Sequence, residues 1–115
     1  MYFVCSYSKK IYNNIKKPIT FSDIGKPLEV RYNWEGVKKD IHVDESQKTL
    51  WRYKSVLPKV NNIISLGEGY TPLQQLAPDL YVKNETVNPT GSFKDRGMSL
   101  AVTLAKAAKD IPLSL

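Results

Sequence analysis

The side chain best suited to chemistry in this sequence is that of Lys94. It comes at the start of a segment with helical periodicity, where unpaired backbone N–H groups place partial positive charge. That field, together with burial beside Phe93, is expected to favour the neutral amine over the ammonium form. A neutral amine is the nucleophile that condenses with an aldehyde cofactor. Position alone is weak evidence, because most lysines in a first helical turn extend into water.

The turn before this lysine carries groups that bind anions and cap helices. Thr90 and Ser92 lie on either side of Gly91, a residue that leaves the turn flexible. Backbone N–H groups at such a helix start bind carboxylates and phosphates. Ser92 is also a good N-cap, and Asp95 three residues later has capping-box spacing. A ligand-binding and a purely structural interpretation of these residues therefore both stay open.

The segment 93–108 is the clearest predicted element, a helix rich in Ala and Leu. Lys106 and Lys109 come near its end, where the helix dipole favours cations, and Pro112 stops it. Its wide apolar surface is typical of a helix buried between a sheet and another layer. The residues that share or extend this apolar face are Met98, Leu100, Ala101, Val102, Leu104, Ala105 and Ala108.

Short β elements and turns precede the helix. The first residues of the chain, about forty of them, read as short β segments, and 28–32 alternates apolar and polar residues as a half-buried strand does. Residues 46–57 have apolar side chains at helical spacing, and a proline follows them. A Gly-rich bend over 66–73 and a short strand over 80–83 lead to the turn at 88–91.

The composition is that of an ordinary globular protein. The chain has 115 residues, 42% of them hydrophobic and 24% charged, and no stretch approaches the ~20 apolar residues that span a bilayer. The start does not read as a secretory signal, and a single cysteine forms no internal disulfide, so we expect a cytoplasmic protein. The net charge of +6 comes from scattered lysines, including doublets at 9–10, 16–17 and 38–39. It predicts a mild preference for anionic ligands, with no nucleic-acid and no membrane partner.

Three segments resemble the threonine synthase family of enzymes that depend on pyridoxal 5'-phosphate (PLP). Residues 50–53 (Leu-Trp-Arg-Tyr), with the Leu-Pro pair at 57–58, resemble the helix that precedes the family's catalytic domain. Residues 66–73 (LGEGYTPL) resemble its Gly-rich loop. Residues 83–97 (KNETVNPTGSFKDRG) resemble the segment around the PLP lysine, and this match is long and specific. The three occur in family order, and the resemblance covers residues 46–109.

The resemblance implies an α/β protein of the tryptophan synthase β-like fold (fold type II). It also implies a lyase of threonine biosynthesis that converts O-phospho-L-homoserine and water into L-threonine and phosphate. Lys94 matches the lysine that holds PLP and moves protons between substrate carbons, first as base and then as acid. Thr90 and Ser92 lie where contact with the anionic groups of the small-molecule substrate, O-phosphohomoserine, is expected.

Four other polar residues near the lysine are expected to serve the structure. Asp95 is interpreted as a cap partner and Arg96 as one side of an ion pair along the helix. Glu68 and Thr71 are expected to shape the Gly-rich loop, with ligand contact as the other open interpretation.

The resemblance also predicts two domains, a small β-rich segment over 1–45 and the start of the catalytic domain over 46–115. Many family members begin with a zinc ribbon that holds two Cys-x-x-Cys knuckles. The first segment resembles a degenerate form of that ribbon. The positions that match the four cysteines are Cys5, Ser8, Phe21 and Ile24.

A metal is not expected in this degenerate ribbon. Three of the four thiolates are missing, and structural zinc needs four nitrogen or sulfur ligands. His42 offers only one nitrogen. We expect apolar packing of Phe21 and Ile24 to take the place of the metal, with Cys5 as a small apolar filler.

The sequence stops after the lysine helix, before the family's later motifs. These are the asparagine beside the cofactor ring, the Gly-rich loop for the PLP phosphate and the group that faces the pyridine nitrogen. We therefore expect an N-terminal fragment without threonine synthase activity by itself. It would be a truncated product or one part of a split enzyme, with a missing C-terminal part or a second copy as partner.

Two other functions stay open. Within the same fold, a cysteate synthase or a threonine dehydratase-like enzyme would share the lysine, although residues 88–96 and the tryptophan-containing helix favour threonine synthase over a dehydratase. From a different class, the chain would be a non-catalytic basic binding domain. Binding to nucleic acid with steep salt dependence would distinguish that function.

Overall fold

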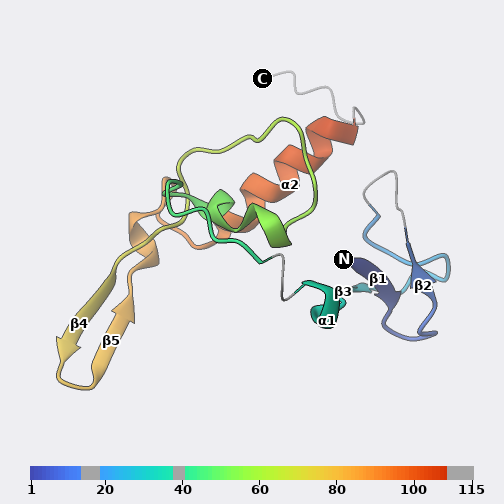
Figure 1. The fold of residues 1–115 in the computed structure, drawn as a ribbon, viewed down its shortest axis with the longest axis horizontal. Coiled ribbons are helices and arrows are strands. Elements are labelled where there is room, and N and C mark those ends of the chain that lie inside the picture. Colours follow the sequence, from blue (N-terminus) through green and yellow to red (C-terminus); the bar gives the residue numbers. More distant parts are fainter. Residues whose placement is uncertain (14–18, 38–40, 109–115) are drawn as a thin grey trace. The chain divides into compact units, whose positions relative to one another are not determined.

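The computed structural model describes residues 1–13, 19–37 and 41–108, which fall in two compact units, Met1–His42 and Val43–Leu115 (Figure 1). Each unit combines one small sheet with helical elements, so the α/β class predicted from the sequence is confirmed at this level. In the described part of the chain, no helix has the length and hydropathy that a membrane span requires. The lysine doublets at 16–17 and 38–39, Lys109 and Pro112 lie outside the described residues.

β1 (Tyr2–Cys5) is the central strand of the first unit. It pairs antiparallel with β2 (Ile11–Tyr12) on one side and with β3 (Leu28–Arg31) on the other. The short β segments expected here, including the strand that starts at residue 28, are therefore confirmed. A single helical turn, α1 (Trp34–Val37), follows β3 and was not anticipated.

Cys5 is fully buried in this unit. The side chain that lies against it is that of Ser22. The Cys5 Sγ lies 3.4 Å from the Ser22 Oγ. Phe21 and Ile24 are 61% and 53% exposed, so the expectation that their packing takes the place of a metal is wrong. The reason is strand geometry. Phe21 forms a β-bridge with Pro27, and because side chains alternate along extended backbone, the next residue is the one that points inward.

The second unit begins with η1 (Leu50–Val56), a 3₁₀ helix in the place where the sequence predicts a helix. The Thr49 hydroxyl caps it by accepting a hydrogen bond from the Trp51 amide at 3.2 Å. As predicted, η1 ends before Pro58. Trp51 is 3% exposed and anchors the small core of this unit.

The chain then forms the hairpin β4 (Leu73–Ala77) and β5 (Leu80–Lys83), the short 3₁₀ helix η2 (Glu85–Val87) and the long helix α2 (Lys94–Ala108). The sequence predicts β5 and α2 correctly. It misses β4, which follows directly on the Gly-rich bend. The hairpin extends away from α2 and η1 (Figure 1).

The most buried side of α2 is polar. Ser99 and Thr103, one helical turn apart, are 8% and 0% exposed, whereas Met98 is 56% exposed. The Trp51 indole donates to the Ser99 hydroxyl at 2.9 Å, and the Thr103 hydroxyl accepts from the Ile64 amide at 2.9 Å. The prediction that Met98 belongs to the buried face is therefore wrong. An irregular segment covers the helix here, and its backbone groups need hydrogen-bond partners, which the two hydroxyls supply.

Replacing Thr103 with valine tests this polar packing. Valine keeps the shape but leaves the Ile64 amide without its acceptor, which should lower the free energy of unfolding by about 1–3 kcal/mol. Urea unfolding followed by far-ultraviolet circular dichroism measures the change. The control is Thr86→Val, because the Thr86 hydroxyl bonds Asn84 at the exposed surface, where changes stay within about 0.5 kcal/mol. Equal effects at the two positions would contradict the account.

Candidate functional site

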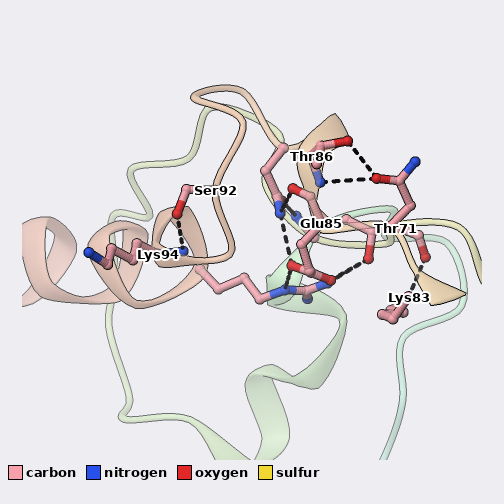
Figure 2. A network of polar contacts seen from close by, with 10 residues as sticks. Thr71, Lys83, Glu85, Thr86, Ser92 and Lys94 are labelled. Carbon is pink, nitrogen blue, oxygen red and sulfur yellow. Dashed lines mark hydrogen bonds and ion pairs between the residues drawn. The ribbon is translucent and has the colours of Figure 1, made fainter.

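Lys94 is the first residue of α2, as predicted, but its side chain is exposed. Figure 2 shows it directed away from Glu85 and Thr71. Phe93 and Met98 on the same part of the helix are 63% and 56% exposed, so no described element covers this surface. The expectation that the amine is shielded from water is therefore wrong for the described residues. The amine is open to a ligand from solution.

The loop before Lys94 is closed by its own side chains. The Lys94 amide donates to the Ser92 hydroxyl at 3.3 Å, so Ser92 caps the helix as predicted. The Asp95 carboxylate accepts from the Thr90 amide at 2.7 Å and from the Thr90 hydroxyl. Asp95 is thus a cap partner, and it holds the helix start through its hydrogen bonds with Thr90. Both candidate substrate-binding residues have hydrogen-bond partners within the chain, which a substrate would replace or share.

Arg96 connects this helix start to the rest of the unit. Its guanidinium donates two hydrogen bonds to the Glu85 carboxylate, at 2.9 Å from Nε and 2.8 Å from Nη2, and a third at 3.0 Å to the Thr71 hydroxyl. The predicted ion pair along the helix is therefore wrong. The residues three and four positions from Arg96 carry no acid, so its partner comes from η2. Figure 2 shows the network around Glu85 and Thr71.

Asn88 extends this network to the Gly-rich loop. Its amide group donates to the Glu85 carboxylate at 2.9 Å and accepts from the Gly69 amide at 3.0 Å. The Thr71 hydroxyl in turn donates to the Glu85 carboxylate at 2.5 Å. The Glu85 carboxylate thus receives hydrogen bonds from three side chains, those of Arg96, Asn88 and Thr71. These hydrogen bonds hold the pKa of the Glu85 carboxyl far below its ordinary value, and those from Arg96 have the largest effect.

Glu68 shapes the Gly-rich loop, as expected. It is 1% exposed, and its carboxylate accepts from the Ser65 hydroxyl at 2.9 Å and from the Leu66 amide at 2.8 Å. Burial opposes its charge, but hydrogen bonds from Ser99 and from these groups hold its pKa below the ordinary value. Its carbonyl accepts from the Leu50 amide at 2.8 Å, which fixes the loop against η1.

Sequence reasoning missed Glu85 and Asn88 as members of this site. Neither belongs to the same helix as Arg96, so the periodicity of that helix gives no signal for them. One signal was available. A guanidinium on the covered side of a helix needs an acidic side chain nearby, because an unpaired buried charge is costly.

The segment around this site matches a known family. Residues 64–112 match the family described as "Pyridoxal-phosphate dependent enzyme", and they include Lys94, the Arg96–Glu85 pair and the β4–β5 hairpin. This segment belongs to that family, whose cofactor is PLP.

Curated relatives of the chain include several threonine synthases. The chain is 42% identical over 96 residues to that of Methanocaldococcus jannaschii, which covers 72% of this chain and 24% of the relative. It is 40% identical over 87 residues to that of Methanosarcina acetivorans, covering 68% and 22%. To that of Halalkalibacterium halodurans it is 47% identical over 66 residues, covering 50% and 19%. The chain thus spans about a quarter of the length of these relatives or less. No solved structure matches it significantly.

The residues around Lys94 fit the family's cofactor in one respect. An exposed primary amine at the first residue of α2 is open to the aldehyde of PLP. The amides of this helix turn are used within the chain: those of Lys94 and Asp95 donate to Ser92, and that of Arg96 donates to Phe93. A phosphate cradle for this cofactor needs donors beyond these three amides.

Proposed function

We propose that this chain contributes the cofactor lysine of a threonine synthase, which converts O-phospho-L-homoserine and water into L-threonine and phosphate. The observation that carries the proposal is the match of residues 64–112 to PLP-dependent enzymes, in a chain that is 42% identical to a threonine synthase over 96 residues. The position of Lys94 at the start of α2, open to a ligand, supports it.

Each residue near the helix start has a proposed role in this reaction. The Nζ of Lys94 would bind the cofactor aldehyde covalently and, once released by the substrate, would accept and return protons. When bound, PLP acts as an electron sink that stabilises substrate carbanions. Thr90 and Ser92 would contact the substrate's anionic groups with the amides and hydroxyls that now cap the helix. The Arg96–Glu85 pair holds the helix start in place.

We expect the 115-residue chain alone to form no threonine. Nothing described here cradles the cofactor phosphate, and one amine without that support binds PLP weakly. The measurement is phosphate release from O-phosphohomoserine, with PLP added. Turnover above that of free PLP by this chain would contradict the expectation.

A chimera tests the function itself. The segment of this chain that the match covers, 72% of its length, replaces its counterpart in the Methanocaldococcus jannaschii threonine synthase, and threonine formation is measured. We expect activity, its loss by more than about a thousandfold in Lys94→Ala, and its retention in Lys106→Ala, at the other end of α2. A folded chimera whose activity survives Lys94→Ala would refute the proposed role.

The first unit is proposed to be a degenerate zinc ribbon held together without metal. The Cys5 Sγ of one turn lies 3.4 Å from the Ser22 hydroxyl of the other. The Ser8 amide donates to the Cys5 Sγ at 3.4 Å, and the Lys26 amide donates to the Ser22 hydroxyl at 3.1 Å. Among the described residues, no group of three or more acidic, Cys or His side chains is arranged to hold a metal. We expect elemental analysis of the purified chain to find zinc far below one equivalent. Stoichiometric zinc would contradict this proposal.

A further inference from the structure

Six of the nine residues in the strands of the β4–β5 hairpin are apolar, yet the hairpin lies on the surface. Every residue of both strands is exposed. The two strands form a sheet by themselves, so their outer edges have no strand partner among the described residues. A two-stranded hairpin is at best marginally stable in water. Its large exposed apolar side chains, each between 39% and 64% exposed, are those of Leu73, Leu76, Leu80, Tyr81 and Val82.

These apolar side chains lie on both faces of the hairpin. The register pairs Gln75 with Tyr81 and Gln74 with Val82. Because successive residues of a strand point to opposite faces, Tyr81 and Val82 point to opposite sides. An antiparallel sheet at a protein surface usually has one apolar and one solvated face, whereas a sheet between two layers is apolar on both. The sequence of this hairpin therefore suits an inner layer with another strand at its edge.

We propose that the hairpin is the docking element for a partner polypeptide of one kind: the part of a threonine synthase-like enzyme that has no counterpart in this chain. The inference rests on the proposed function. Two observations select this partner. The family match includes both the hairpin and Lys94. The chain accounts for 24% of the length of the Methanocaldococcus jannaschii relative, so about three quarters of such an enzyme is available to cover the exposed strands.

The start of α2 adds a second apolar surface next to Lys94. Phe93 and Met98 are 63% and 56% exposed there. A partner that covers this surface also removes water from around the amine, which the chain by itself does not do. Docking would thus complete the site as well as the sheet.

The test is association in the absence of PLP. The tagged chain is co-expressed with the Methanocaldococcus jannaschii threonine synthase from which the matched segment has been removed, and the complex is recovered through the tag. We expect a one-to-one complex, reduced about tenfold by Val82→Lys, which places a charge in the covered strand. Tyr7→Lys is the matched control, because Tyr7 is 75% exposed and lies in the first unit. Equal recovery of the two variants would overturn the proposal, and so would a chain that assembles only with itself.

A second measurement does not depend on the truncated relative folding alone. In the covalent chimera described above, hydrogen exchange of the hairpin amides is compared with exchange in the 115-residue chain. We expect protection to rise at least about tenfold in the chimera. Unchanged exchange overturns the proposal, and so does a chimera that does not fold, since this surface would then not fit the enzyme. Lys94→Ala should associate normally, so activity that survives Lys94→Ala with association intact refutes the proposed function alone.

Discussion

Replacing Gly69 with alanine is expected to abolish the cooperative unfolding transition of the second unit. Gly69 has a φ of +100°, where other residues are strained, and a Cβ there would lie 2.6 Å from the backbone nitrogen of Leu50. That nitrogen cannot move aside without breaking its 2.8 Å hydrogen bond to the Glu68 carbonyl. The backbone strain, the clash and the lost bond together should cost more than about 4 kcal/mol.

Gly67 provides the matched control two residues earlier in the same loop. Its φ is +90°, but a Cβ there would meet nothing within 4 Å. Gly67→Ala should therefore cost only the backbone strain, about 1–2 kcal/mol. Urea unfolding followed by circular dichroism measures both variants. If Gly69→Ala unfolds like Gly67→Ala, the close packing of the Gly-rich loop against η1 is not as described.

The Glu85→Gln substitution has the second largest expected effect on the free energy of unfolding. It keeps the shape of the side chain and removes the charge that pairs with Arg96, so the guanidinium is left without its counter-ion. Breaking a fully buried pair costs about 3–5 kcal/mol, and because both side chains are 25% exposed we expect about 2–3 kcal/mol. The control is Glu29→Gln, whose Arg31 pair lies at the surface and should cost less than about 0.5 kcal/mol.

This pair also predicts how stability depends on pH. Arg96, and then Thr71 and Asn88, lower the pKa of Glu85 in the folded chain. The stabilisation is therefore fully present above the pKa of an unfolded glutamate, about 4.3, and is lost as the pH falls through the lower folded pKa. Between neutral pH and the acid range, the difference in unfolding free energy between wild type and Glu85→Gln should shrink only below about pH 4. A difference that is constant down to pH 2, measured by urea unfolding, would contradict this.

The sequence predicted the elements better than it predicted their contacts. The helix from Lys94, the strand from Leu80 and the break before Pro58 follow from local rules of periodicity, capping and proline geometry, and the structure confirms them. The segment around Lys94 was also recognisable, because its residue types are specific. Local patterns of this kind need no knowledge of distant residues.

The contacts were harder because they depend on residues far apart in the sequence. Nothing near Arg96 indicates that its partner is Glu85, eleven positions earlier. The polar inner side of α2 was missed because Ser99 and Thr103 face an irregular segment. The backbone groups of that segment need hydrogen-bond partners, which hydroxyls supply and apolar side chains do not. The exposure of Lys94 was missed because burial was inferred from an apolar helix whose cover is not among the described residues.

The central claim is that Lys94 is the amine that takes the cofactor, and its most direct test is covalent trapping. The chimera with the Methanocaldococcus jannaschii relative is incubated with PLP and reduced with borohydride, and its peptides are mapped by mass spectrometry. We predict one cofactor label, on the peptide that contains Lys94, and no label at Lys106 or in the Lys94→Ala variant. A label on another lysine, or labelling that survives Lys94→Ala, would contradict it.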